Sequence, residues 1–289
     1  MPEIEVLSTG LYATLQDEGR PGFQSQGVPL GGAMDRKSAA LANQLVGNAL
    51  DTPVVESTLL GPKLRFHGPA QIALAGASIR PKLNGRAIPT YRTVAVQTGS
   101  VLDIRGMHKG CRTYLAIRGD WVIRRWLGSC SPPPYQSDLL TPESRLKPGQ
   151  RLQIKAFAPI EPRRIPPQER PNFPKIYDIR VFPGPEWGAF ASAATAHFLS
   201  QAFTLSKDTN RMGLRLREAL PAAERLPTLL SSAVLPGTVQ APPSGQPIIL
   251  MADAQTTGGY PRLAQVCTND LPALAPWSHG DRIRLSLDP

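Results

Sequence analysis

The sequence predicts a mainly β protein with a few helices (a β-rich α+β protein), and two observations lead to this class. The chain of 289 residues contains 31 prolines and 25 glycines, many for its length, which favours short strands joined by turns over a helical bundle. Short apolar runs of strand length recur along the chain, separated by turn sequences such as Asn84-Gly85. The hydrophobic content of 41% is typical of a soluble folded protein.

The first half is predicted to form a β unit with one main helix. Residues 4–16 alternate like a hairpin. Asp35 is a good N-cap for a helix that runs to Val46 and that Gly47 ends. The density of short strands that follow indicates a barrel or a sandwich. These predicted strands are residues 54–60, 64–67, 71–75, 93–97, 101–105 and 113–118, with a closing strand at 151–157 after an irregular segment at 129–150.

A proline-rich segment at residues 158–174 contains six prolines and is the predicted linker. It divides the chain into an N-terminal β unit at 1–157 and a C-terminal β unit at 175–289. The second unit is predicted to carry a helix from about residue 185 to residue 203. Its predicted strands lie at residues 176–182, near 204, and at 214–217, 238–240, 246–250, 263–267 and 283–287.

Charge and composition narrow the class of partner. The net charge is +10, but the basic residues are dispersed and no aromatic residues are interleaved with them, so we expect no nucleic-acid partner. No apolar run is long enough to cross a bilayer, so no membrane partner is expected. The three cysteines lack metal-ligand spacing and no signal peptide is recognised, which predicts a cytoplasmic protein with reduced thiols.

The stretch at residues 248–262 carries the most chemistry. A short apolar run there is followed by a loop of small polar residues, two glycines and a proline. Its glycines allow a positive φ or a close approach of the backbone to a ligand, although a tight turn between two strands explains the stretch equally well. Together with other polar loops it provides the candidate substrate-binding residues Gln16, Arg20, Arg211, Gln240, Gln255, Thr256, Thr257, Gly258, Gly259 and Tyr260.

Two carboxylates, Asp17 and Asp253, are the candidate catalytic residues, because either could act as a base or orient an arginine. Arg20 and Arg211 are candidate anion clamps, since the planar guanidinium matches a carboxylate or a phosphate. Backbone N–H groups at 257–259 could stabilise an oxyanion or a phosphate. A structural function, such as pairing of Asp17 with Arg20, fits most of these residues at least as well.

Motif searches exclude several classes of site. The sequence has no GxxxxGK[ST] phosphate loop, no GxSxG nucleophile, no HExxH and no paired CxxC. The four histidines are far apart in the sequence, so no metal site is expected. No lysine lies in the Met-Lys-Met setting of a biotin attachment site, so covalent biotin is not expected.

Several longer blocks resemble one family. They are residues 14–23 (TLQDEGRPGF), 27–35 (GVPLGGAMD), 41–48 (LANQLVGN), 56–62 (ESTLLGP), 211–213 (RMG) and 246–261 (QPIILMADAQTTGGYP). In this order they are similar to the signature of the allophanate hydrolase subunit 2 family, which is biotin-dependent-carboxyltransferase-like. That family includes the C subunit of the prokaryotic 5-oxoprolinase, the antagonist of a sporulation-kinase inhibitor and the equivalent part of urea carboxylase.

The resemblance implies a cyclophilin-like fold of two β-barrel-like units. It also implies a partner, the B subunit (subunit 1), and for the oxoprolinase the A subunit as well. The complex would use ATP to open 5-oxoproline to glutamate. The substrate would be a small anionic or amide compound. Two alternatives remain: a non-catalytic regulatory binding partner of a kinase-inhibitor-like subunit, or the carboxyltransferase component of a urea carboxylase or allophanate hydrolase system.

The sequence departs from the family pattern at several positions in its first half. Gly31 stands where serine is usual, Gly119-Asp120-Trp121 replaces a Gly-Gly-Ile-type turn, and Cys130 replaces the arginine of a Leu-Gly-Ser-Arg-Ser-Thr pattern. Residues 132–140 replace a glycine-rich continuation. If the missing arginine contacts substrate or partner, the first half has altered specificity or has lost activity, whereas the intact 253–260 loop predicts that the second half keeps its role.

The loop at residues 16–20 offers polar and glycine chemistry that matches the loop at 253–260. We therefore expect the two loops to face each other across a cleft between the units. A structure that places them on opposite surfaces would refute this expectation.

Overall fold

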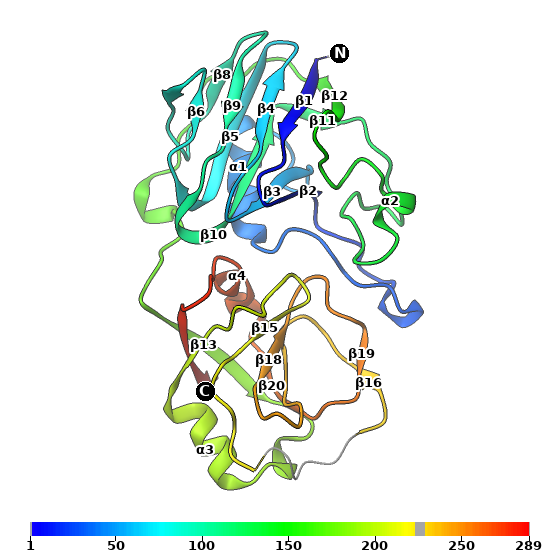
Figure 1. Cartoon of the computed structure of the whole chain (residues 1–289), viewed down its shortest axis with the longest axis vertical. Coiled ribbons are helices and arrows are strands. Elements are labelled where there is room, and N and C mark those ends of the chain that lie inside the picture. Colours follow the sequence, from blue (N-terminus) through cyan, green and yellow to red (C-terminus); the bar gives the residue numbers. More distant parts are fainter. Residues whose placement is uncertain (1, 223–228, 289) are drawn as a thin grey trace. The chain divides into compact units, whose positions relative to one another are not determined.

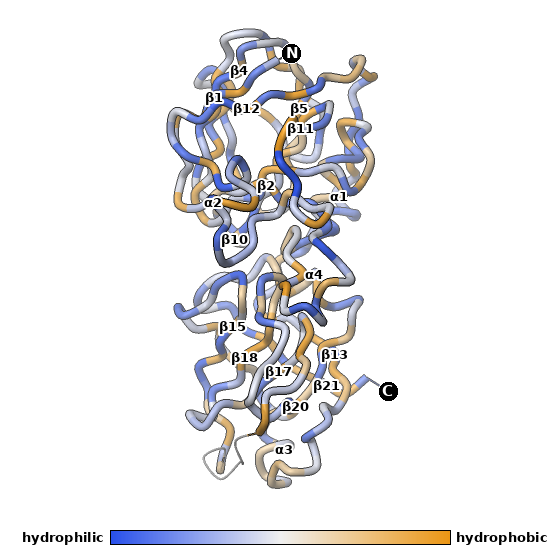
Figure 2. Tube along the Cα trace, turned by 90° about the vertical axis from the view of Figure 1, so that its right-hand side faces the viewer, coloured by the Kyte–Doolittle hydropathy of each residue, from blue (hydrophilic) through white to orange (hydrophobic). Residues whose placement is uncertain are grey.

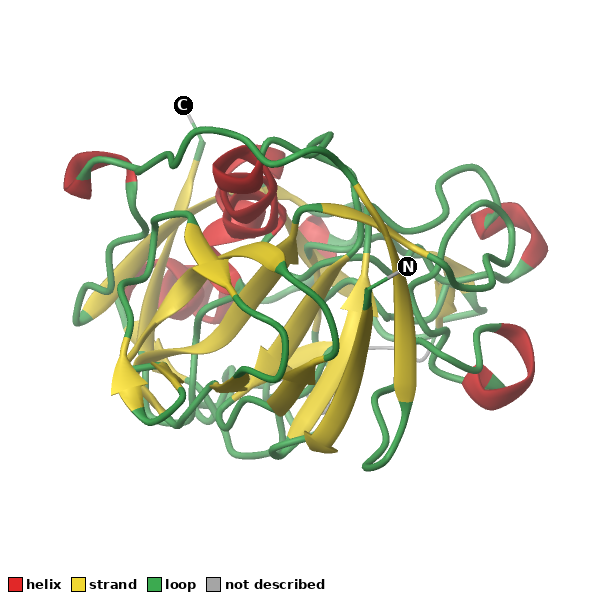
Figure 3. Cartoon of the chain, turned by 90° about the horizontal axis from the view of Figure 1, so that it is seen from above, coloured by secondary structure: helices red, strands yellow, loops and turns green. Residues whose placement is uncertain are grey.

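The computed structural model describes residues 2–222 and 229–288, and strands and loops make up most of this part of the chain (Figure 3). This confirms the mainly β class. The chain divides into two compact units (Figure 1). Unit 1 comprises Met1–Arg20 and Gly31–Phe173, and unit 2 comprises Pro21–Leu30 and Pro174–Pro289.

Unit 1 contains two sheets whose strand pairs are all antiparallel. The seven-stranded sheet has the order β11 (Gly119–Trp121), β12 (Arg151–Ala156), β1 (Glu3–Ser8), β4 (Lys63–Phe66), β9 (Val101–Asp103), β6 (Lys82–Leu83) and β7 (Arg86–Ala87). The five-stranded sheet has the order β2 (Tyr12–Gln16), β3 (Val54–Thr58), β10 (Met107–Ile117), β5 (Ala70–Ile79) and β8 (Val94–Val96).

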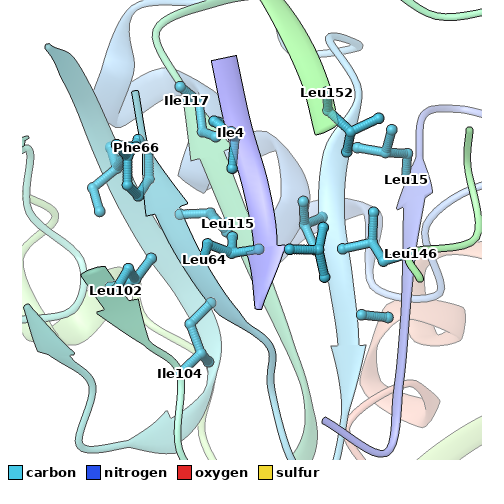
Figure 4. Close-up of a cluster of buried hydrophobic side chains, with 14 of the residues drawn as sticks. Ile4, Leu15, Leu64, Phe66, Leu102, Ile104, Leu115, Ile117, Leu146 and Leu152 are labelled. Carbon is cyan, nitrogen blue, oxygen red and sulfur yellow. The ribbon is translucent and has the colours of Figure 1, made fainter. Parts of the chain in front are cut away.

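The main core of unit 1 is an apolar layer to which both sheets contribute. Ile4 and Leu64 come from the seven-stranded sheet, and Leu15 and Leu115 come from the five-stranded sheet. Figure 4 shows Ile4, Leu64 and Leu115 meeting in this layer. Along β1, buried residues alternate with more exposed ones because successive side chains of a strand point to opposite faces. The tube in Figure 2 shows hydrophobic and hydrophilic residues mixed along the strands.

Helix α1 (Arg36–Val46) packs on the five-stranded sheet through a second apolar cluster. Asp35 accepts a hydrogen bond from the Ser38 N–H at 2.9 Å, and Gly47 has φ 68° at the C-terminal end. The N-cap and the glycine stop predicted for this helix are therefore confirmed. Unit 1 also contains the short helix α2 (Ser137–Leu140) and the 3₁₀ turn η2 (Pro167–Glu169).

The proline-rich segment 158–173 is hydrogen-bonded to the rest of unit 1. The Ile160 N–H donates to the Gln71 side-chain oxygen at 2.9 Å, and the Ile165 N–H donates to the Tyr91 carbonyl at 3.0 Å. Proline favours an extended backbone that can follow a surface in this way. That residues 1–157 and 175–289 fold as separate domains around a linker stays a prediction.

Unit 2 is built on a second seven-stranded sheet. Its order is β14 (Ala202–Thr204), β21 (Arg282–Leu287), β13 (Ile176–Pro183), β20 (Arg262–Val266), β17 (Thr238–Gln240), β18 (Ile248–Leu250) and β15 (Gly213–Arg215). The pair β13 and β21 is parallel, and the other pairs of this sheet are antiparallel. A two-stranded ladder joins β16 (Ser232–Ala233) to β19 (Thr257–Gly258).

The helices of unit 2 are short. Helix α3 (Ser192–Ser200) packs on β21. Among the described residues of this unit, the other helical elements are η1 (Gln24–Gln26), η3 (Trp187–Ala189), η5 (Thr268–Asp270) and α4 (Leu271–Leu274). None of the helices in the described ranges is long and apolar enough to cross a membrane.

Two local predictions are wrong. The predicted hairpin at residues 4–16 does not form, because β1 pairs with β4 and β12 whereas β2 pairs with β3. The predicted helix at residues 185–203 is reduced to η3 and α3, since Phe190 is extended and β14 pairs with β21. Sheet pairing over long sequence distances decided both outcomes.

Candidate functional site

The Asp17 carboxylate follows strand β2 in unit 1 and lies in a cradle of hydrogen-bond donors. Oδ1 accepts from the hydroxyls of Ser129 at 2.6 Å and Ser131 at 2.7 Å, and from the Gly19 N–H at 2.9 Å. Oδ2 accepts from the Cys130 N–H at 2.7 Å. The loop after β2 is thus tied to a segment more than a hundred residues away.

These donors determine the ionisation of Asp17. Burial disfavours the charged form, but the hydrogen bonds from Ser129, Ser131, Cys130 and Gly19 outweigh burial and lower the pKa of Asp17 below its ordinary value. A carboxylate with a lowered pKa and four donors on its oxygens is a poor proton acceptor near neutral pH. The cradle therefore favours a positioning role for Asp17 over the predicted role as a base.

Arg20 lies fully buried beside the same segment. Its guanidinium donates to the Ser131 carbonyl and lies 5.0 Å from the Trp126 ring centroid. Gly31 adopts φ 68°, and a Cβ atom there would lie 3.1 Å from Arg20 Nη1. Serine at residue 31 would thus crowd this guanidinium.

Three of the departures from the family pattern therefore meet in one place. Gly31 lies beside Arg20, Cys130 donates its N–H to Asp17, and Pro132 directly follows the cradle serine Ser131. The Cys130 side chain is fully buried within the main apolar core, where burial raises the pKa of its thiol. Position 130 therefore provides no cation to a ligand.

Arg125 supplies a cation at this place. Its Nη1 lies 3.5 Å from Asp17 Oδ2, and its Nη2 lies 3.6 Å from Asp120 Oδ1. Its side chain is 38% exposed, so the guanidinium borders solvent. We did not predict Arg125, Ser129 or Ser131 as site residues, because only their hydrogen bonds to Asp17 identify them.

Gln16 lies next to Asp17 and is fully buried. Its side-chain N–H donates to Thr14 Oγ1 at 2.9 Å, and its Oε1 accepts no hydrogen bond from any described group. Gln16 and Asp17 line a small pocket of about 30 Å³ together with residues of α1 and the 50–52 turn. A pocket of this size holds one water molecule, not a substrate.

Arg211 and Asp253 form a buried ion pair in unit 2. Arg211 Nε lies 2.7 Å from Asp253 Oδ2, and its Nη2 lies 2.9 Å from Oδ1, which is a bidentate geometry. The Asp253 N–H also donates to the Arg211 carbonyl at 3.0 Å. Of the roles predicted for Asp253, this geometry favours orienting the arginine.

Three of the predicted binding residues, Gln240, Gln255 and Tyr260, line one pocket of about 180 Å³ in unit 2. Other polar groups join them, and apolar side chains form the remaining walls. The other lining residues are Asp208, Asn210, Met212, Gly213, Arg215, Ile248 and Leu250. The lining joins six polar side chains to three apolar ones, which suits a small polar ligand.

The remaining predicted residues, 256–259, lie beside this pocket but do not line it. Thr257 and Gly258 form β19, which pairs with β16, and the Thr256 carbonyl accepts from the Val234 N–H at 3.0 Å. A Cβ atom at Gly258 would lie 2.6 Å from Gln240 Nε2. Neither glycine of the loop has a positive φ, so a close approach by the protein's own Gln240 explains Gly258.

The structure thus brings the predicted residues together as two groups, one in each unit. Gln16, Asp17 and Arg20 form the first group, and Gln240, Gln255 and Tyr260 gather in the second. That the 16–20 and 253–260 loops face each other stays a prediction. Within the described residues, no group of three or more histidine, cysteine, aspartate or glutamate side chains is arranged to hold a metal ion.

Most of the chain is similar to proteins of known family. A family model described as the carboxyltransferase domain, subdomain A and B, matches residues 26–287. The chain is 36% identical over 276 residues to the 5-oxoprolinase C subunit of Escherichia coli, covering 94% of this chain and 87% of that protein. It is 34% identical over 291 residues to the 5-oxoprolinase C subunit of Haemophilus influenzae, covering 97% and 90%.

A solved structure has the same fold. The crystal structure of the Kluyveromyces lactis urea carboxylase matches with a TM-score of 0.91 and 29% sequence identity. The match covers 99% of this chain but 27% of that chain. This chain therefore corresponds to about a quarter of that protein.

Proposed function

We propose a function on the premise that this chain belongs to the carboxyltransferase domain family of subdomains A and B, as its match over residues 26–287 shows. The proposed function is that of the C subunit of a 5-oxoprolinase, which acts in the cytoplasm with the B subunit (subunit 1) and the A subunit as partners. The complex would use ATP to open 5-oxoproline to glutamate.

One observation carries the proposal. The chain is 34–36% identical to two proteins named as the C subunit of 5-oxoprolinase, and it spans 87–90% of their length. The urea carboxylase structure, in contrast, is matched over 27% of its chain. The match over most of the length of the two C subunits favours their function over that of the longer urea carboxylase.

The pocket in unit 2 fits the substrate class. 5-Oxoproline is a small cyclic amide with one carboxylate, so a site for it needs a cation, amide partners and apolar walls. Arg215 provides the cation, and Asn210, Gln240 and Gln255 provide amide groups. We assign Arg215 to the carboxylate, and Gln240 and Gln255 to the ring amide.

The two buried carboxylates would then position the loops instead of moving protons. Asp253 holds Arg211 through both carboxylate oxygens, the geometry of a residue that orients its partner. Asp17 instead holds the 129–131 segment through neutral donors. The group that activates the amide, and the ATP site, are assigned to the partner subunits, since this sequence has no phosphate-loop motif.

The test is 5-oxoproline-dependent ATP hydrolysis by this chain purified with its cognate subunits. We expect Arg215→Ala to raise KM for 5-oxoproline by about tenfold or more, because a desolvated charge partner is worth at least about 1.4 kcal/mol. Arg217→Ala is the matched control, since Arg217 is exposed and does not line the pocket. An unchanged KM in Arg215→Ala would refute the substrate assignment, and urea-dependent instead of 5-oxoproline-dependent hydrolysis would favour the carboxyltransferase alternative.

A second candidate is a regulatory binding partner without turnover, and the Cys130 region favours it. The family pattern has an arginine where this chain has Cys130, whose thiol is buried. The nearby cation, Arg125, is instead partly exposed. Stable co-purification with the B subunit, with no hydrolysis in any combination of subunits, would support this candidate. Hydrolysis that requires this chain would exclude it.

A further inference from the structure

A basic hollow lies on unit 1, and none of the predicted site residues lines it. It has a volume of about 380 Å³, and its charged lining residues are Lys63, Arg65, Lys82, Asp103 and Arg105. Four cations and one carboxylate line it, so the lining has a net charge of +3. A concave surface with one dominant charge concentrates counter-ions of the opposite sign.

The strand register places these residues on one face of the seven-stranded sheet. Asp103 of β9 is the cross-strand partner of Lys63 on β4 and of Lys82 on β6. The neighbouring row, Leu64, Leu102 and Leu83, belongs to the main core of unit 1. Since successive side chains point to opposite faces, Lys63, Asp103 and Lys82 project to the outer face.

The spacing of the strands determines the distance between the backbones of the two lysines, Lys63 and Lys82. Adjacent strands lie about 4.8 Å apart, so the backbones of Lys63 and Lys82, two strands apart, are separated by about 10 Å. Each lysine side chain is long and flexible. Both ammonium groups can therefore reach one elongated anion above Asp103.

The two arginines of the hollow already have acidic partners, and the lysines do not. Arg65 Nη1 lies 3.2 Å from Glu5 Oε2, and Arg105 Nη2 lies 3.2 Å from Asp103 Oδ2. Within the described part of the chain, neither Lys63 nor Lys82 forms an ion pair. These two lysines are the cations that a ligand would engage.

We propose that this hollow binds the phosphate chain of a polyphosphate anion. Lysine binds phosphate as a point charge, and the net lining charge of +3 suits an anion with three or four charges. No aromatic side chain lines the hollow, so a nucleobase has nothing to stack on. Inorganic triphosphate and the triphosphate of a nucleotide share this chemistry. The proposal does not depend on the proposed function, because it requires no turnover.

The experiment is calorimetric titration of the full chain at low ionic strength with inorganic tripolyphosphate and, separately, with ATP. We expect both to bind with similar Kd values. Lys63→Ala with Lys82→Ala should weaken binding by about tenfold or more, because two charge contacts are lost. Asp103→Asn should tighten it, since a like charge is removed from beneath the anion.

The matched control removes two exposed lysines elsewhere in unit 1, Lys109→Ala with Lys155→Ala, and lowers the net charge equally. An equal loss of affinity in both double variants would show general attraction to a basic protein and would overturn the proposal. Absence of binding by the wild-type chain would also overturn it. Much tighter binding of ATP than of tripolyphosphate would do so too, since a base contact would then dominate. Circular dichroism verifies that each variant is folded.

Discussion

Two buried carboxylates, one in each unit, are held in opposite ways. Asp17 is surrounded by hydroxyl and backbone N–H donors, and its cation, Arg125, is partly exposed at 3.5 Å. Asp253 is held by the bidentate guanidinium of Arg211, which is buried as deeply as Asp253 itself. Two aspartates that are equivalent candidates in the sequence therefore have different environments in the structure.

The two carboxylates depend on different numbers of partners. Several neutral donors share the stabilisation of Asp17, so loss of one is partly compensated by the others. Asp253 depends on one partner, and loss of that partner would leave a buried charge unpaired.

The largest loss of unfolding free energy is expected for Arg211→Ala. Removing the guanidinium leaves Asp253 buried without its bidentate partner, which should cost about 3–5 kcal/mol of unfolding free energy. Urea denaturation of the wild type and the variant measures this difference. A double variant, Arg211→Met with Asp253→Leu, should recover much of the loss. A loss below about 1 kcal/mol in Arg211→Ala would show that Asp253 does not depend on this pair.

A smaller effect is expected for Ser129→Ala. This change removes one hydroxyl donor at 2.6 Å from Asp17 and should cost about 1–3 kcal/mol. It should also raise the pKa of Asp17, since that hydrogen bond lowers the pKa. NMR titration of the carboxyl carbon measures the pKa, and Ser200→Ala at an exposed position is the control. An unchanged pKa would contradict the cradle as its cause.

The pH dependence of stability should differ in sign between two carboxylates of unit 1. The pKa of Asp17 is lowered, so its contribution is present above the unfolded pKa of about 3.9 and is lost as the pH falls through the folded pKa. Burial raises the pKa of Asp35, so its contribution is present below about pH 3.9 and is lost as the pH rises through the folded pKa.

Stability curves of Asp17→Asn and Asp35→Asn against pH test this contrast. The destabilisation by Asp17→Asn should shrink in acid. The effect of Asp35→Asn should become more favourable toward neutral pH, because asparagine keeps the N-cap without a buried charge. Curves for both variants that run parallel to the wild type would contradict the two pKa shifts.

The smallest loss of unfolding free energy is expected for Arg125→Ala. Its ion pairs at 3.5 and 3.6 Å involve a side chain that is 38% exposed, so we expect a change of at most about 1 kcal/mol. Added salt should reduce this change further. A loss comparable to that of Arg211→Ala would show that Asp17 depends on one cation after all.

Short-range features of the fold could be predicted from the sequence. The helix capped by Asp35 and ended by Gly47 is confirmed, because cap and stop act within a few residues. The predicted family is confirmed by the match over residues 26–287, since its blocks are long and ordered. The hairpin at residues 4–16 was wrong because the strand pattern does not specify the partner strand.

The candidate site was predictable only in part. The polar character of their loops predicts Gln240, Gln255 and Tyr260, and the structure gathers them in one pocket. Ser129 and Ser131 were missed, because two serines in an irregular segment carry no signal until the chain brings them against Asp17.

The mainly β class, the helix at residues 36–46 and the family follow from the residues alone, because propensities, caps and ordered motifs can be read along the chain. That neutral donors surround Asp17 while a guanidinium holds Asp253 follows only from the folded chain. The partners that set each carboxylate's environment are distant in sequence, 112 to 114 residues away for the cradle serines and 42 residues away for Arg211.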